Sequence, residues 1–453
     1  MKQWRVHVVS AGVWRHVFLA CVMCATTGMA CAETLRQAIE MALANHPRVL
    51  AAAAQQRAAE QDVAQARAGY FPSVDLNLAD GKERTDTPQT RALGSSTSDL
   101  VRREAGVTVV QKLFDGMATA SEVQRQTARL SVATSRLAEV REEIALKAIE
   151  VYLEVYNNRE LVKLSNNNLS SHLGTQDKVR QRVQGGVSQR TDLQQAQGRV
   201  ALAKSVVSAR GGRLRQAEAN YKTVVGRLPG DLTEQEVKPP TTLDTGVIDS
   251  VRLTQSIKIA SEAAFSSNPT LGAANAEVAV AEASVRNARS QYYPRINLEA
   301  SAGRNQNIAG IKGDYNSEAL MLVLRWNLFR GGADRAQERG LIERRYAAID
   351  TAANTRRDVE EKVALALNAK ATSEERLESL RDHVKYSAEA LSAYQQQLEL
   401  GRRTLLDVLN AENELFTARS NLSAGIFEDL FSQYALEAAK GTLVKSLGIT
   451  LTD

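Results

Sequence analysis

Cysteine is scarce in this chain of 453 residues, and its few copies are confined to one end. Cys21, Cys24 and Cys31 all fall within the first 32 residues. The remaining chain therefore has no thiol for nucleophilic catalysis and no pair for a disulfide. Proline (8 residues) and aromatic side chains (5%) are also scarce, whereas Ala, Gln, Glu, Arg and Leu abound. This composition is typical of long helices and coiled coils.

The usual signatures of catalysis are missing as well. His46, His172 and His383 stand far apart, without the spacing of metal ligands. The sequence has no phosphate-binding loop, nucleophile elbow or dinucleotide fingerprint. Acidic residues alternate with basic ones at the intervals of a solvated helix face, and the net charge is only +5. The sequence thus predicts no enzyme, no metal or cofactor site and no nucleic-acid-binding protein.

Residues 1–32 differ in composition from the rest and predict a secretory signal. A basic start precedes a mostly apolar run over 17–29, and Ala30-Cys31-Ala32 fits a small-x-small cleavage pattern. No other stretch provides the roughly 18 apolar residues of a membrane-spanning helix. We expect export and cleavage after Ala32, so that the mature chain begins at Glu33. Lipidation at Cys31 is the alternative, although the residues before it fit a lipobox poorly.

A turn near the end of the chain has an earlier counterpart. Gly401 is able to adopt the positive φ that ends one helix, and Thr404 is suited to cap the next. The same pattern of helix end and helix start occurs at Gly186. In both copies an aspartate, Asp192 or Asp407, lies six residues after the glycine. Two helical hairpins with matching tips predict an internal duplication.

Other landmarks recur at equal spacing. A helix interrupted at Pro47 stops at Pro72, and a second one interrupted at Pro269 stops at Pro294, so both intervals are 25 residues. Long proline-free segments then lead to the two tips, and at 1.5 Å per residue each predicts a helix of about 100 Å. Their apolar positions repeat every seven residues, which indicates supercoiling against neighbouring helices. These positions are Val123, Leu130, Leu137, Ile144 and Val151 before the first tip, Leu377, Val384, Leu391 and Leu398 before the second, and Val408, Leu415, Leu422, Leu436 and Leu443 after it, with Asp429 as the exception.

Apolar and polar residues alternate after Tyr70-Phe71-Pro72 and again after Tyr292-Tyr293-Pro294, as in strands with one apolar face. Val74, Leu76 and Leu78 alternate with polar residues, and Ile296 and Leu298 do so in the second copy. Segments of about 10 residues match tilted transmembrane strands, and four strands are too few to close a barrel, so closure requires oligomerisation. The expected loops cover 81–103 and 303–317, and the expected return strands cover 107–114 and 320–329. Aromatic residues at the helix-proximal ends predict a membrane-interface belt of Tyr70, Phe71, Phe114, Tyr292, Tyr293, Trp326 and Phe329.

The chain is thus predicted to be mainly α-helical with a small membrane β-barrel contribution. Each protomer provides duplicated long-helix hairpins and four transmembrane strands. The expected parts are a signal peptide (1–32), a first repeat (33–227), a linker between the repeats (228–253), a second repeat (254–447) and a C-terminal tail (448–453).

In this order, the landmarks resemble the TolC family of trimeric outer-membrane channels. The resemblance rests on the Asn-Pro helix start, the Tyr-Phe-Pro and Tyr-Tyr-Pro stops, the Leu-Phe-x-Gly corners and the two glycine–aspartate tips. It implies a homotrimer with a twelve-stranded barrel in the outer membrane of a Gram-negative cell and an α-helical tunnel through the periplasm. It also implies two partners, a periplasmic adaptor at the tips and an inner-membrane transporter of the ABC or proton-driven type.

The resemblance assigns roles to residues of the tips. Asp407 matches an acidic ring of the periplasmic gate, and Asn410 occupies the position of a second ring. Arg403 matches a residue that tethers the closed tip, with Thr191 and Asp192 as its expected partners across the hairpins. The tyrosine that the family often has three residues before the tip glycine is Leu398 here. The residues of the tip turns expected to dock the adaptor are Gly186, Val187, Gly401, Arg402 and Thr404.

The predicted function is a passive exit duct of a tripartite machine, with a protein exported by type I secretion as the expected cargo. The first alternative is a multidrug efflux channel. A periplasmic coiled-coil adaptor is less consistent with two hairpins and paired strands, and a purely structural coiled coil leaves the strands unexplained.

Overall fold

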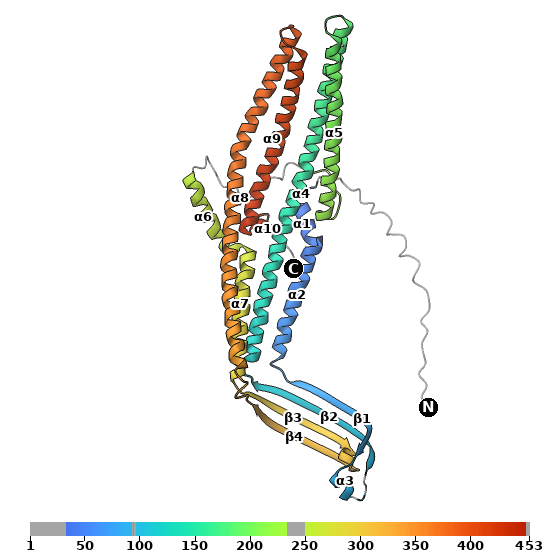
Figure 1. The fold of residues 1–453 in the computed structure, drawn as a ribbon, viewed down its shortest axis with the longest axis vertical. Coiled ribbons are helices and arrows are strands. Elements are labelled where there is room, and N and C mark those ends of the chain that lie inside the picture. The colour runs from blue at the N-terminus through green and yellow to red at the C-terminus, as the bar shows by residue number, and fades with distance from the viewer. Residues whose placement is uncertain (1–32, 93, 95–96, 233–249, 450–453) are drawn as a thin grey trace, which may run out of the picture.

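The computed structural model describes residues 33–449, apart from 93, 95–96 and 233–249. The predicted signal, with its choice between cleavage after Ala32 and lipidation at Cys31, and most of the predicted linker therefore lie outside the described residues. The molecule is elongated, with two hairpin tips at one end and a four-stranded sheet at the other (Figure 1).

The helices follow the same plan twice. In each repeat two helices meet at a proline, and a helix of 67 residues then turns back into one of 36 residues. Proline suits the first position of a helix because the N–H that it lacks would have no partner there. The first repeat contains α1 (Leu35–Asn45), α2 (Pro47–Ala68), α4 (Ala118–Gln184) and α5 (Arg190–Val225), and the second contains α6 (Ser250–Ser267), α7 (Pro269–Arg289), α8 (Ala333–Glu399) and α9 (Leu405–Lys440).

The hairpin α8/α9 reproduces the hairpin α4/α5 residue for residue. Ala333 is the counterpart of Ala118 and Lys440 that of Val225, an offset of 215 positions throughout. The two hairpins therefore have equal helix lengths and equivalent turn positions, as the matching tips predict. Short helices complete the chain: α3 (Pro88–Ala92) between two strands, α10 (Leu443–Ser446) near the end, and the 3-10 turns η1 (Ser290–Tyr292) and η2 (Ile308–Gly310).

The strands form one antiparallel sheet in the order β1-β2-β3-β4. Its register aligns Val74, Val109, Ala300 and Leu320 across the four strands. β1 and β4 are the two edges of the sheet, and neither has a described strand paired along its outer side. The strands are β1 (Ser73–Thr85), β2 (Ser98–Phe114), β3 (Arg295–Gln306) and β4 (Asp314–Arg325).

The boundaries of both strand hairpins differ from the expected ones, and the second hairpin enters the predicted loop 303–317 from both sides, since β3 ends at Gln306 and β4 begins at Asp314. The first hairpin continues well into the predicted loop 81–103, because β-pairing persists through polar residues beyond the apolar band. Arg103 lies 3.3 Å from Asp80, and Arg84 lies 3.5 Å from Asp99, across the β1–β2 ladder. The last strand is shorter than 320–329 and ends at Arg325, so apolar alternation extended the prediction past the end of the ladder.

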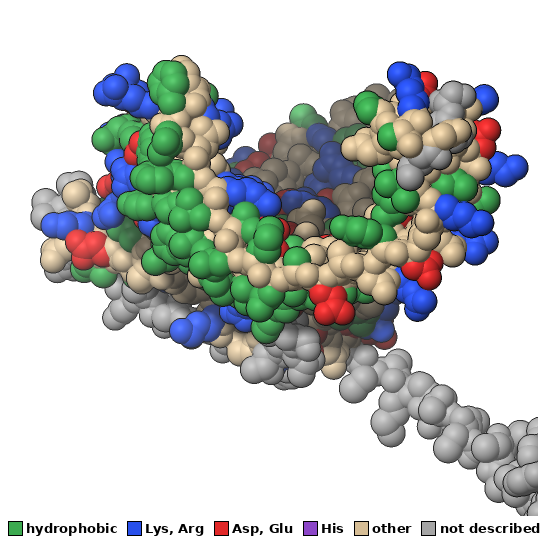
Figure 2. All heavy atoms as spheres, turned by 90° about the horizontal axis from the view of Figure 1, so that it is seen from below, with side chains coloured by type: hydrophobic (Ala, Val, Ile, Leu, Met, Phe, Trp, Pro, Cys, Tyr) green, Lys and Arg blue, Asp and Glu red, His purple; other side chains and the backbone are tan. Residues whose placement is uncertain are grey.

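The sheet is curved, and one of its faces is apolar. From the sheet end the molecule is hollowed, with hydrophobic side chains along the outer side of the curve (Figure 2). Leu76 and Leu320 on this face are 66% and 72% exposed, which is unusual for large apolar side chains in water. In the part of the chain that the structure describes, no helix has the length and apolarity needed to cross a membrane.

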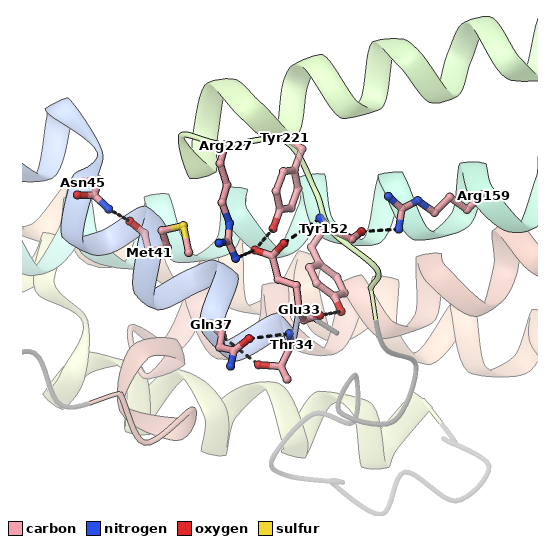
Figure 3. Close-up of polar contacts among 10 residues, drawn as sticks. Glu33, Thr34, Gln37, Met41, Asn45, Tyr152, Arg159, Tyr221 and Arg227 are labelled. Carbon is pink, nitrogen blue, oxygen red and sulfur yellow. Dashed lines mark hydrogen bonds and ion pairs between the residues drawn. The ribbon is translucent and has the colours of Figure 1, made fainter. Parts of the chain in front are cut away.

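The start of the described chain packs in the largest core cluster, which joins α1, α2, α4, α5, α9 and α10. The carboxylate of Glu33 accepts hydrogen bonds from the Tyr221 hydroxyl (2.7 Å) and the Gly230 amide (3.2 Å), and it lies 2.9 Å from the Arg227 guanidinium (Figure 3). Burial acts to raise the pKa of Glu33, but the bonds from Arg227 and Tyr221 outweigh it and lower that pKa. Glu33 is therefore charged, and it fastens α1 to the end of α5.

Candidate functional site at the hairpin tips

Both tips are built by the same turn. Gly186 and Gly401 have φ of 74° and 72°, a conformation that glycine adopts without steric cost. The next amides, of Val187 and Arg402, each donate to a carbonyl five residues earlier at 2.8 Å. This is the Schellman pattern, which satisfies the last carbonyls of a helix. The predicted turns are thus present, and Gly186, Val187, Gly401 and Arg402 form the ends of the two hairpins.

The two aspartates of the tips act first as helix-capping residues. Asp407 Oδ2 accepts from the amide of Thr404 at 3.2 Å and from its hydroxyl at 2.8 Å. Asp192 Oδ2 accepts from the amide of Gln189 at 3.2 Å. The hydrogen bonds from Thr404, with Arg403 nearby, lower the pKa of Asp407, so this carboxylate is charged at neutral pH. Capping accounts for the common position of the two aspartates after the glycines.

Arg403 makes its contacts within its own hairpin. Its Nε donates to Gln397 Oε1 at 3.0 Å, and its guanidinium carbon lies 4.4 Å from the ring centre of Tyr394. Its Nη1 lies 3.8 Å from Asp407 Oδ2. The structure does not bring it to Thr191 or Asp192 of the same chain, so the tether predicted for these residues would have to form between chains.

Asn410 connects the two hairpins. Its Oδ1 accepts a hydrogen bond from Arg199 of α5 at 2.7 Å. Nearby, Val179 of α4 packs with Leu405 and Leu409 of α9 in a small apolar cluster. Sequence reasoning missed Arg199, because nothing in the local pattern links residues 211 positions apart.

A groove of about 480 Å³ lies below the turns, between the hairpins. Apolar side chains from both hairpins line it, among them Val179 and Val187 of the first and Leu398 and Val408 of the second. Leu398 replaces the tyrosine expected from the resemblance and lies in this wall. Tyr394, one helical turn earlier, is the aromatic residue that stacks with Arg403.

A buried histidine–carboxylate contact lies deeper between the hairpins. His172 Nδ1 of α4 lies 2.8 Å from Glu412 Oε2 of α9, and both side chains are at least 96% buried. Ser171 and Thr175 donate to the other carboxylate oxygen at 3.1 and 2.8 Å. Burial acts to raise the pKa of Glu412, but the bonds from His172 and Thr175 prevail and lower it. No local sequence pattern predicts this pair, since it depends on how α4 and α9 cross.

The seven predicted interface aromatics lie at the opposite end, where helices meet the sheet. All are at least 37% exposed, and Phe329 reaches 84%. The Trp326 indole donates to the carbonyl of Tyr292 at 3.2 Å. Their role at a membrane interface stays a prediction. Among the described residues, no group of three or more His, Cys, Asp or Glu is arranged to hold a metal ion.

The family profile described as "Outer membrane efflux protein" matches residues 38–227 and 260–444, which together are most of the chain. The chain belongs to this family. It is an outer-membrane channel of the TolC type that extends into the periplasm of a Gram-negative cell, and it is not an enzyme.

Relatives and solved structures agree with this assignment. The outer membrane efflux protein BepC of Brucella suis is 27% identical over 92% of this chain and 87% of its own. The proteases secretion protein PrtF of Dickeya chrysanthemi is 24% identical over 94% of this chain and 92% of its own. A crystal structure of CusC superposes with a TM-score of 0.76 at 16% identity and covers 90% of this chain and 91% of that one.

Proposed function

We propose that three copies of this chain assemble into a twelve-stranded barrel continued by a helical tunnel. The observation that carries the proposal is the open sheet, whose edges β1 and β4 have no partner strand among the described residues although its outer face is apolar. An unpaired edge is not tolerated in the hydrocarbon core, because its N–H and C=O groups would have no hydrogen-bond partner. Pairing β1 of one copy with β4 of the next removes every edge.

The assembly is tested by native mass spectrometry of the protein extracted from outer membranes with detergent. We expect a mass of three chains, together with ion conductance after reconstitution in a planar bilayer. A monomer released by osmotic shock without detergent would overturn the proposal.

We further propose that the tips form the periplasmic gate. Asp407 and Asn410 then face the axis, and Arg403 of one chain reaches Thr191 and Asp192 of its neighbour when the gate is closed. The charged state of Asp407 supports an acidic constriction, and the contacts of Arg403 within its own hairpin show which bonds the tether would compete with. Replacement of Arg403 by Ala is expected to raise single-channel conductance, and an unchanged conductance would remove it from the tether.

Two substitutions at Asp407 provide a matched test of the acidic gate. Asp407→Asn should weaken the block of the channel by divalent cations, whereas Asp407→Glu, which keeps the negative charge, should leave it nearly unchanged. Equal effects of the two substitutions would mean that the charge of Asp407 does not cause the block.

The tip turns and the groove below them are proposed to receive a periplasmic adaptor, which connects the duct to an inner-membrane transporter of the ABC or proton-driven type. The apolar groove between the hairpins supports this role, because an amphipathic helix buries its apolar face in such a groove. Val187, which is 70% exposed at the first turn, would be an anchor. Val187→Asp should abolish capture of the adaptor while the trimer remains intact.

The cargo is proposed to be a protein exported by type I secretion, and multidrug efflux is the second candidate. PrtF is named for secretion of proteases and BepC for efflux, so relatives of both kinds match this chain over nearly its whole length. A periplasmic adaptor role fits less well, because an adaptor offers no use for the apolar sheet. Deletion of the gene should abolish the appearance of a specific secreted protein in the medium. Increased drug sensitivity with normal secretion would favour efflux.

A further inference from the structure

Each chain has two helical edges in its tip half. α5 packs mainly on α4 and touches α1 and α9, and α8 packs on α9, α7 and α6. The contact between the two hairpins is made mainly by α4 and α9, so α5 and α8 lie on opposite sides of this pair (Figure 1). Both edges therefore present helix faces that no other described element covers.

The edge formed by α5 is basic. This helix has seven Lys or Arg residues and only two acidic ones. Four of the basic residues are exposed and lie along one flank, since spacings of 14, 11 and 7 residues each return to nearly the same side of a helix. We call them the basic stripe: Arg190, Lys204, Arg215 and Lys222. Arg199, which reaches Asn410 of α9, points to the other flank.

The edge formed by α8 has an acidic flank, and Lys385, which is also exposed, lies beside it on the helix. Glu375, Glu378, Asp382 and Glu389 are exposed and share one flank, again at helical spacing, and we call them the acidic stripe. This flank faces away from α9. One position further along the chain, Arg376 and His383 turn toward α9 and pair with its Glu428 and Glu414 at 2.7 and 2.8 Å.

Neither stripe is neutralised within the chain. None of these eight side chains forms an ion pair or a side-chain hydrogen bond with another described residue, although many other charged residues of the helices do. A basic flank on one edge and an acidic flank on the other are complementary.

The stripes also match in height. Lys204 lies 18 residues after Gly186, and Asp382 lies 19 residues before Gly401. At 1.5 Å per residue, both lie about 28 Å below the tips. Arg215 and Glu375, at 29 and 26 residues from their tip glycines, lie about 40 Å below them. Both tips end in the same turn, so distances counted from Gly186 and from Gly401 start at equivalent points.

We propose that the basic stripe of one chain packs against the acidic stripe of a second copy, with Lys204 opposite Asp382. The inference rests on the trimer proposed above and specifies its contact in the tip half. Three such seams close the helical tunnel, as three β1–β4 pairs close the barrel at the other end. A second copy is the occupant that the geometry favours, because the complementary surface is carried by the same chain at the same height.

Crosslinking provides the first test, and residues 33–453 have no cysteine of their own to interfere. Lys204→Cys combined with Asp382→Cys, treated with a short bis-maleimide on intact cells, should give covalent dimers and trimers in denaturing gels. The matched control keeps Lys204→Cys but places the second cysteine at His383, the adjacent residue that faces α9. It should give at least tenfold less crosslinked trimer.

The outcomes separate the seam from the trimer. Equal crosslinking in both variants, or none in either one while native mass spectrometry still gives three chains, overturns the seam and leaves the trimer standing. A native mass of one chain overturns the trimer itself.

Charge reversal provides the second test. Lys204→Glu should lower the dissociation temperature of the trimer by about 3–5 °C, since the change is repeated three times around the ring. Adding Asp382→Lys should restore it, and high salt should reduce both effects because exposed charges are screened. Failure of the second substitution to rescue the first would contradict a direct pairing, and binding of the unchanged adaptor by the rescued variant would exclude the adaptor as the occupant.

Discussion

The hairpins α4/α5 and α8/α9 have the same helix lengths and the same turn, but they carry different side chains. α5 has an excess of basic residues, whereas its counterpart α9 has six acidic and two basic ones. The backbone plan therefore depends on the repeated turns and on the absence of proline, which both copies share. Surface charge was free to diverge, because it affects which neighbour each hairpin meets more than whether the helices form.

The interiors of the two hairpins differ at equivalent positions. Repeat 1 buries Val155 and Ala217 where repeat 2 buries Lys370 and Ser432. Asp429, the exception in the heptad pattern, is the counterpart of Leu214 and is also buried. Its carboxylate accepts from Ser373 at 2.8 Å and from Gln433 at 2.9 Å. A charged residue at a core position is thus retained because its hydrogen bonds are supplied by the same two helices.

The largest expected effect concerns the buried contact between His172 and Glu412, which joins the two hairpins. Glu412→Ala leaves the buried His172 without its carboxylate partner and removes the acceptor of Ser171 and Thr175, and we expect a loss of about 4 kcal/mol in stability. Thermal unfolding of the detergent-solubilised protein, followed by circular dichroism, measures it. The control is Glu414→Ala, which breaks an exposed pair with His383 and should cost less than about 1 kcal/mol. Similar losses for both variants would show that the buried pair does not hold the hairpins together.

The next effect concerns the polar interior of the second hairpin. Asp429→Leu leaves buried donors without an acceptor and should cost about 3 kcal/mol. The triple variant Lys370→Val, Asp429→Leu, Ser432→Ala copies the residues of repeat 1 and should recover most of that loss. Melting temperatures of the single and the triple variant measure this recovery. A triple variant less stable than the single one would mean that the two interiors are not interchangeable.

A pH dependence is expected at the joint between α4 and α10. Glu142 accepts from the amides of Leu443 and Val444, yet burial raises its pKa to about 7, and Glu437 adds to the rise. A carboxyl that binds its proton more tightly when folded stabilises the protein at low pH. That stability is lost as pH rises from about 4.5 through about 7, by about 3 kcal/mol in all.

This dependence is measured by comparing the melting temperatures of wild type and Glu142→Gln at pH 5.5 and pH 8. The variant should lose the part of the decrease that Glu142 causes. An identical decrease in both proteins would assign it to other groups.

The smallest effect distinguishes the two tips. Thr404 caps α9 with its side chain, whereas Gln189 makes no such bond to α5. Thr404→Ala should therefore cost about 1 kcal/mol and speed hydrogen exchange of the second tip. Gln189→Ala should change the exchange of the first tip much less, and a reversed order would contradict the assigned caps.

Much of the fold was predictable because its signals are local. The proline at the start of α2 and α7, the glycines of the tips and the proline-free intervals between them specified the helices. The strands were predicted from alternation, which works only where one face is apolar. Their polar ends, such as Asp80 paired with Arg103, were therefore missed. The sequence did not distinguish a capping role of Asp192 and Asp407 from a role in the gate, because both roles require an aspartate at the same position.

By itself, the sequence determined the duplication, the lengths of the helices and the position of both turns, since each depends on residues close together in the chain. Only the tertiary structure decided that His172 meets Glu412, that Arg199 meets Asn410 and that Glu33 fastens α1 to α5. Such contacts join residues far apart in the chain and depend on the angle and depth at which the helices cross. Periodicity specifies which face of a helix is buried, but it does not specify the partner of that face.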